Sequence, residues 1–263
     1  MKQLLAIEYA KLKKLTSIKI IFLAYMVIIP LWMYFMDFFF HEHPELKGLF
    51  TGDDFFVFPH IWKFATYSAS FFNVLMGVTV VIITCNEIQF KTMRQNVIDG
   101  LPKQDVIISK FLVILAISLL VSFYTFLVGF VMGGIYSGFG NAYNGIDKVV
   151  LYFIQTLGYF SFAFLFAIIV KKPALSIIFF IIYFPIETIG GAFLPHVIYE
   201  FFPLKIYADL TPLPFFEKLV SQEETRTGVA LWSMPEQLRL ALAFVYILFF
   251  FGLSYFILKK RDL

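Results

Sequence analysis

Long apolar runs alternate with short polar stretches along the whole chain. Each of six runs is expected to cross a bilayer as a helix, and five of them reach about 20 residues, roughly 30 Å of helix. The fifth is shorter before Gly190, but it is needed if the lysines at 171–172 and 259–261 are to lie on one side. The expected spans are residues 18–40, 61–85, 111–136, 149–170, a run from residue 174, and 238–258. The pattern predicts an all-α integral membrane protein, with residues 1–263 as a single transmembrane domain.

Two of these runs carry residues that shape a helix. Pro30 lies in the middle of the first run and is predicted to kink it, because proline removes one backbone hydrogen bond. The third run ends in Gly129-x-x-x-Gly133 and Gly134-x-x-x-Gly138, spacings that resemble close-packing motifs of membrane helices. For Gly138 the alternative is that it marks the exit loop.

The N-terminal stretch, residues 1–16, is predicted to be a helix lying in the membrane interface. Its leucines fall on one side of a helical wheel and its lysines lie off that side, so the lysines can face anionic lipid headgroups. Glu8 falls inside the apolar arc. It either faces lipid or pairs with Lys11, three residues on, and the sequence leaves both open.

The stretch 190–237 is a second irregular region. It contains five prolines, yet its first half is rich in Phe, Leu and Ile. A solvated loop would be more polar, so short re-entrant or interfacial helices are expected. Ser233 and Glu236 have capping-box spacing and predict the start of the last helix.

The most polar interruption is the stretch 86–110. Met93, Val97 and Leu101 recur at i, i+4 and i+8, which predicts one apolar stripe on a short helix with basic flanks. Gly100 is a helix stop, and Pro102 opens the next segment. Such a helix can insert into a groove of a partner. The alternative is an ordinary basic loop held by anionic lipid.

Composition and charge place the chain in a membrane and orient it. The chain is 60% hydrophobic and 15% charged, too apolar for a soluble domain. Most lysines and arginines fall in the termini, the 86–110 stretch and the turn at 171–172. By the positive-inside rule both termini are expected in the cytoplasm. The single cysteine, Cys85, excludes an internal disulfide, and the first run is too long for a cleaved signal peptide.

Catalytic chemistry of its own is not expected from this chain. It has no Gly-x-x-x-x-Gly-Lys-Ser/Thr phosphate loop, so no nucleotide site is predicted. His41-Glu42-His43 is not a zinc-protease motif, and no catalytic triad has supporting context. No catalytic residue, bound cofactor, metal or nucleic-acid partner is therefore predicted.

Glu187 is the candidate for a polar role within an apolar run. A carboxylate inside a membrane costs several kcal/mol, so it is a functional candidate by default, in a translocation path or an outer gate. The favoured alternative is that Pro185 and Gly190-Gly191 break the helix there, leaving Glu187 near the outer interface with access to water.

Three groups of residues resemble a known family. Glu8, Tyr9 and Lys11 resemble its interfacial elbow helix, and the Pro-rich region resembles its paired re-entrant helices. A third resemblance lies in the segment after the second span, where the family has a Glu, a Thr, a Pro and a Lys. The corresponding residues here are Glu87, Thr92, Pro102 and Lys110. The family is that of type-2 ATP-binding-cassette (ABC) transporter permeases, specifically small six-span subunits. The chain departs from it at Lys91, where Gly is common, and at Lys103-Gln104, where Ser-Arg is common.

The resemblance implies a transport subunit of the cell (inner) membrane. Two permease subunits, identical or homologous, would stand on two ATPase subunits that bind ATP and Mg, and export is expected. Residues 87–109 would be the cytoplasmic coupling segment, with contacts from Glu87, Lys91, Thr92, Met93, Arg94, Val97 and Leu101. The alternatives are a secondary transporter, against which the lack of two similar halves counts, and a membrane-embedded enzyme using Glu187. The substrate stays open.

Overall fold

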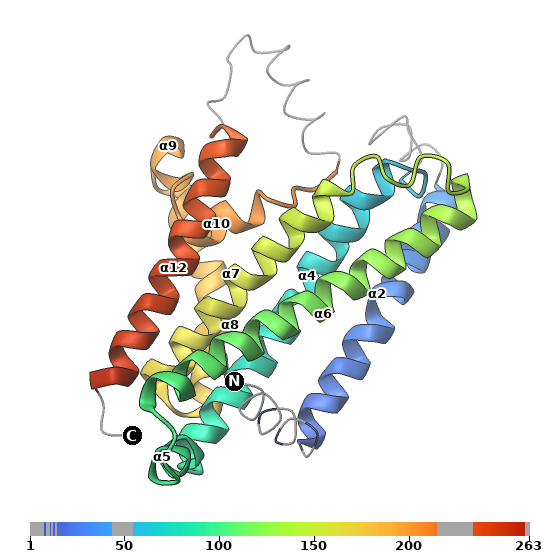
Figure 1. Ribbon diagram of the computed structural model, residues 1–263. Helices are drawn as coiled ribbons and strands as arrows, with labels where there is room; N and C mark the ends of the chain where they lie inside the picture. The colour runs from blue at the N-terminus through green and yellow to red at the C-terminus, as the bar shows by residue number, and fades with distance from the viewer. Residues whose placement is uncertain are drawn as a thin grey trace.

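The computed structural model describes residues 8, 11, 13, 15–43, 55–214 and 234–260. Within these ranges, six helices are long and apolar enough to cross a membrane, and they stand side by side (Figure 1). They are α2 (Thr16–Glu42), α4 (His60–Gln89), α6 (Lys103–Ser137), α7 (Asp147–Val170), α8 (Pro173–Ala192) and α12 (Glu236–Lys260). The prediction of an all-α, multi-pass membrane protein is confirmed.

Helix α7 forms the centre of the bundle. It packs against α4, α6, α8 and α12, and most of its apolar stretch is buried. Helix α2 lies at one side and packs along α4 (Figure 1). The outward faces of α2, α8 and α12 are exposed and apolar, as expected for helices that contact lipid.

Glycines let aromatic rings approach the helix backbones closely. A Cβ on Gly129 would meet the Trp62 ring at 3.2 Å, and one on Gly133 would meet the Phe58 ring at 2.5 Å. The space over this glycine pair is filled by the rings of Trp62, in α4, and of Phe58, just before it. Gly138 instead has φ 69 and ends α6, which agrees with the exit-loop alternative.

The fifth span is longer and more regular than the sequence suggested. Helix α8 runs unbroken through Pro185 and Gly190-Gly191 to Ala192, so the helix break placed at these residues in the favoured alternative for Glu187 is wrong. Neighbouring helices support a proline-containing membrane helix by packing against it. Phe180 of α8, for example, is fully buried against Gly77 of α4.

Two short helices follow α8 in the Pro-rich region. They are α9 (His196–Tyr199) and α10 (Pro203–Ala208). Tyr207 of α10 is buried, its ring lies on Gly158 of α7, and its hydroxyl donates to the Ala243 carbonyl of α12 at 3.2 Å. Short helices are thus confirmed for the described part of this region, whereas Ser233 of the expected capping box lies outside it.

Candidate functional site

A left-handed residue, Lys91, separates α4 from α5 (Thr92–Ile98). Its backbone has φ 55 and ψ 23, a conformation that costs a residue with a Cβ about 1–2 kcal/mol. The Thr92 hydroxyl donates to the Glu87 carbonyl at 3.4 Å and so satisfies one of the last carbonyls of α4. Glycine adopts this conformation most readily, which gives a physical reason for the glycine common here in the family that the sequence resembles.

A Schellman motif ends α5. The Gly100 amide donates to the Val97 carbonyl at 3.1 Å, and the Leu101 amide donates to the Asn96 carbonyl at 3.0 Å. Gly100 has φ 97, as this motif requires. Helix α6 then begins directly after Pro102. The helix stop at Gly100 and the new segment at Pro102 are both confirmed.

The apolar stripe of α5 faces the protein itself. Met93 is only 3% exposed, and Val97 and Leu101 are half-buried. The exposed apolar side chains of this segment are Phe90, 74% exposed, and Ile98, 67% exposed. Arg94 is exposed as well. Phe90, just before α5, and Arg94 and Ile98 in α5 are thus exposed to the surroundings; we call these three residues the α5 outer face.

Four charged side chains from three parts of the chain meet at the α5 end of the bundle. The Lys110 ammonium, on α6, lies 2.7 Å from Glu8 Oε1 and contacts Glu87 Oε2 at the end of α4. The Lys11 ammonium lies 3.3 Å from Glu8 Oε1 and 3.7 Å from Glu87 Oε1. We call Glu8, Lys11, Glu87 and Lys110 the four-charge cluster.

Burial makes these pairs interdependent. Glu8 and Lys110 are each 2% exposed and Glu87 is 6% exposed, so each charge depends on its partners rather than on water. Burial acts to raise the pKa of Glu8, but the charges and hydrogen bonds of Lys110 and Lys11 outweigh it and lower this pKa below its usual value. The two carboxylates and two ammonium groups balance to zero net charge.

The cluster joins elements on both sides of α5. Glu87 lies five residues before Thr92, the first residue of α5, and Lys110 lies in α6, which follows it. Glu8 and Lys11 belong to the helix residues described before α2. Of the two alternatives left open for Glu8, the pair with Lys11 is the one the structure shows, whereas no sequence pattern indicated the link from Glu8 to Lys110. Tyr9, the third residue predicted in this helix, lies outside the described residues.

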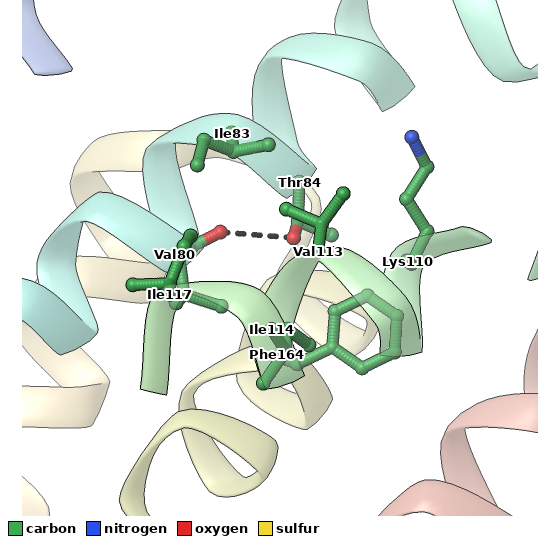
Figure 2. Close-up of a pocket in the computed structure, with 8 residues that line it drawn as sticks. All are labelled: Val80, Ile83, Thr84, Lys110, Val113, Ile114, Ile117 and Phe164. Atoms are coloured by element: carbon green, nitrogen blue, oxygen red, sulfur yellow. Dashed lines mark hydrogen bonds between the residues drawn. The ribbon is translucent and has the colours of Figure 1, made fainter. Parts of the chain in front are cut away.

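Beside the cluster lies a small apolar cavity. It has a volume of about 10 Å³ and is bounded by α4, α6 and α7 (Figure 2), which is space for about one water molecule. The Thr84 hydroxyl donates back to the Val80 carbonyl at 2.9 Å. The stem of Lys110 lines the cavity, while its ammonium group points away from Phe164 and Ile114 (Figure 2). The cavity is too small for a transported molecule.

Glu187 lies far from the four-charge cluster in the fold and caps a helix. It is buried, and its Oε1 accepts a hydrogen bond from the Lys205 amide at 2.8 Å, in the first turn of α10. The expected helix break and water access at Glu187 are therefore wrong. Its place in a translocation path stays a prediction.

Ion pairs surround the two short helices. The Lys205 ammonium lies 2.7 Å from Asp209 Oδ1 and 3.6 Å from Glu200 Oε1, while the Arg239 guanidinium lies 3.8 Å from Glu200 Oε2. Arg239 of α12 also lies 3.7 Å from Asp209 Oδ2, so it attaches α12 to the ends of both short helices. Within the described ranges, no group of three His, Cys, Asp or Glu residues is placed to hold a metal ion.

Comparison with known proteins identifies one family. A family model described as an ABC-2 family transporter protein matches residues 4–187, which include the four-charge cluster, α5 and Glu187. No curated protein gives a significant match.

Proposed function

The chain belongs to the ABC-2 family of transporter proteins, and we propose that it is the permease subunit of an ATP-driven exporter whose ATP is hydrolysed by a separate subunit. The observation that carries this proposal is the position of the four-charge cluster. It ties the helix before α2, the end of α4 and the beginning of α6 together around α5. A displacement of α5 would therefore be transmitted to all three of these helices at once.

The α5 outer face is the proposed contact with the ATPase. Phe90 and Ile98 are large apolar side chains left exposed on a polar segment, and the exposed Arg94 lies midway between them in sequence. Exposed apolar residues in a polar setting mark interaction sites. Met93, Val97 and Leu101 are assigned a different role, which is to seat α5 on its own bundle.

Rigid connections on both sides of α5 support the coupling. Two residues, Phe90 and Lys91, join α5 to α4. On the other side, the Schellman motif and Pro102 join α5 to α6. The Gln95 amide group also donates to Asp99 Oδ1 at 2.8 Å, closing the end of the helix. Force on a short, well-capped helix moves it as a body instead of unwinding it.

Charge supports the proposed orientation, and the family resemblance supports the proposed assembly. The positive-inside rule favours a cytoplasmic position for the α5 end, and with it for both termini, in the cell (inner) membrane. The cavity next to Lys110 has room for only about one water molecule. The family resemblance also supports a second permease subunit, with the transport path between the two and with ATP and Mg bound by the ATPase subunits. Export itself rests on the resemblance to small six-span permeases.

The test is ATP hydrolysis by the complex that co-purifies with the tagged chain in lipid nanodiscs. Phe90→Asp with Ile98→Asp is expected to lower co-purified ATPase activity at least tenfold, while the chain itself inserts and folds normally. The matched control is Tyr143→Asp, since Tyr143 is 83% exposed on the loop between α6 and α7. An unchanged activity in the double variant, or an equal loss in the control, would contradict the proposal.

A further inference from the structure

Helix α2 contains a proline at mid-length that leaves a carbonyl without its helical donor. In an α-helix the amide of residue i donates to the carbonyl of residue i−4, so Pro30 removes the donor for Met26. Helix α2 nevertheless runs unbroken from Thr16 to Glu42 through Pro30. Water is absent from the bilayer core, and a carbonyl there must be satisfied by the protein.

Tyr124 of α6 supplies the missing donor. Its hydroxyl donates a hydrogen bond to the Met26 carbonyl, the very group that Pro30 leaves free. The ring of Tyr124 also lies 6.3 Å from that of Tyr25, the residue before Met26. A side chain from a neighbouring helix thus replaces a backbone amide at the point where α2 is weakest.

Other polar contacts hold α2 on either side of this point. Towards the α5 end, the Tyr25 hydroxyl bonds that of Tyr152 at 2.8 Å, and Tyr152 donates to Asn73 Oδ1 at 2.8 Å. Towards the opposite end, the Tyr136 hydroxyl donates to Asp37. Helix α2 packs along α4, whereas the ties to α6 named here are the Tyr25–Tyr124 ring contact and two hydroxyl hydrogen bonds.

We propose that α2 is hinged at Pro30 and that the Tyr124 hydroxyl is the latch that holds the hinge. While the bond to the Met26 carbonyl is made, the two halves of α2 keep one fixed angle. When the bond breaks, the half before Pro30 and the half after it move relative to one another. Tyr124 is thus a positioning residue, and the inference concerns this chain alone, whatever its partner.

A double-mutant cycle on the purified chain in nanodiscs tests the latch. Tyr124→Phe removes the donor and is expected to lower the thermal unfolding midpoint by about 2–4 °C. In a Pro30→Ala background the amide of residue 30 satisfies Met26, so the same Tyr124→Phe change is expected to cost less than about 1 °C. Equal shifts in the two backgrounds, or none in either, would overturn the proposal. Tyr34→Phe, at an exposed tyrosine of α2, is the control and should leave the unfolding midpoint unchanged in both backgrounds.

Distances between spin labels test the hinge itself. Labels at Ile20→Cys and Phe38→Cys, in a Cys85→Ala background, lie on exposed positions in the two halves of α2, and 18 residues of helix separate them by roughly 27 Å. With wild-type Tyr124 we expect a narrow distribution of label-to-label distances. Tyr124→Phe is expected to broaden or shorten that distribution, and adding Pro30→Ala to Tyr124→Phe should make it narrow again. An unchanged distribution in Tyr124→Phe would show that no hinge is latched there.

Discussion

Replacing Lys110 by methionine removes the cation at the centre of the four-charge cluster. Methionine keeps most of the length and the apolar stem of lysine, so the packing against Val113 and Phe164 beside the cavity is preserved. Glu8 and Glu87 then lie buried near each other, and among the described residues Lys11, at 3.3 Å and 3.7 Å, is the cation left to balance them. Leaving a buried charge without its partner typically costs about 3–5 kcal/mol.

This cost is large enough to measure as a change in thermal unfolding. For a chain of this size each kcal/mol is worth roughly 2–4 °C, so Lys110→Met is expected to lower the unfolding midpoint by roughly 6–20 °C in nanodiscs. Lys148→Met is the control. Lys148 pairs with Asp147 at 3.0 Å, but that aspartate is well exposed, and such a pair contributes about 0–1 kcal/mol.

The stability of the wild type and that of Lys110→Met are expected to change in opposite directions as the pH falls. In the wild type the lowered pKa of Glu8 contributes stability that is present above the unfolded value, about 4.3, and is lost as the pH falls through the folded value. In Lys110→Met, burial dominates and the pKa of Glu8 is expected to rise, so stability should increase as the pH falls from 8 to 5. Adding Glu8→Gln and Glu87→Gln should recover much of the loss. A drop in the unfolding midpoint of Lys110→Met no larger than that of Lys148→Met would refute the reasoning.

Two further predictions concern single substitutions to or from glycine, and thermal unfolding checks both. Lys91→Gly should stabilise the chain by about 0.5–1 kcal/mol, because glycine adopts the left-handed conformation at φ 55 without the Cβ penalty; a loss of stability would contradict the assignment of strain to Lys91. Gly158→Ala should destabilise by about 1–3 kcal/mol, because its Cβ would lie 2.2 Å from the Tyr207 ring. Gly190→Ala, which meets nothing within 4 Å, is the control and should be neutral or stabilising.

The spans could be predicted because each is a long apolar run bounded by polar or turn residues. Pro185 misled the prediction for the fifth run. A proline removes one hydrogen bond, but the α8 helix is held by packing such as Phe180 on Gly77, and that packing cannot be seen in the local sequence.

The candidate site could be predicted only in part, for a related reason. The 3.6-residue period identifies the stripe of Met93, Val97 and Leu101, but it does not say whether the stripe faces the chain or a partner. The link from Glu8 to Lys110 joins residues about 100 positions apart, so no local pattern encodes it. The available signal was the presence of Glu8, Glu87 and Lys110 next to apolar segments, where each charge needs a partner.

The central claim is that the α5 outer face contacts an ATPase subunit, and site-specific photocrosslinking in cells tests it most directly. A photoreactive residue at Ile98, which is 67% exposed, should crosslink to a protein whose sequence contains the Gly-x-x-x-x-Gly-Lys-Ser/Thr phosphate loop. The same residue at Tyr143 should not. Crosslinks from Ile98 to lipid alone, or the same products from both positions, would contradict the claim.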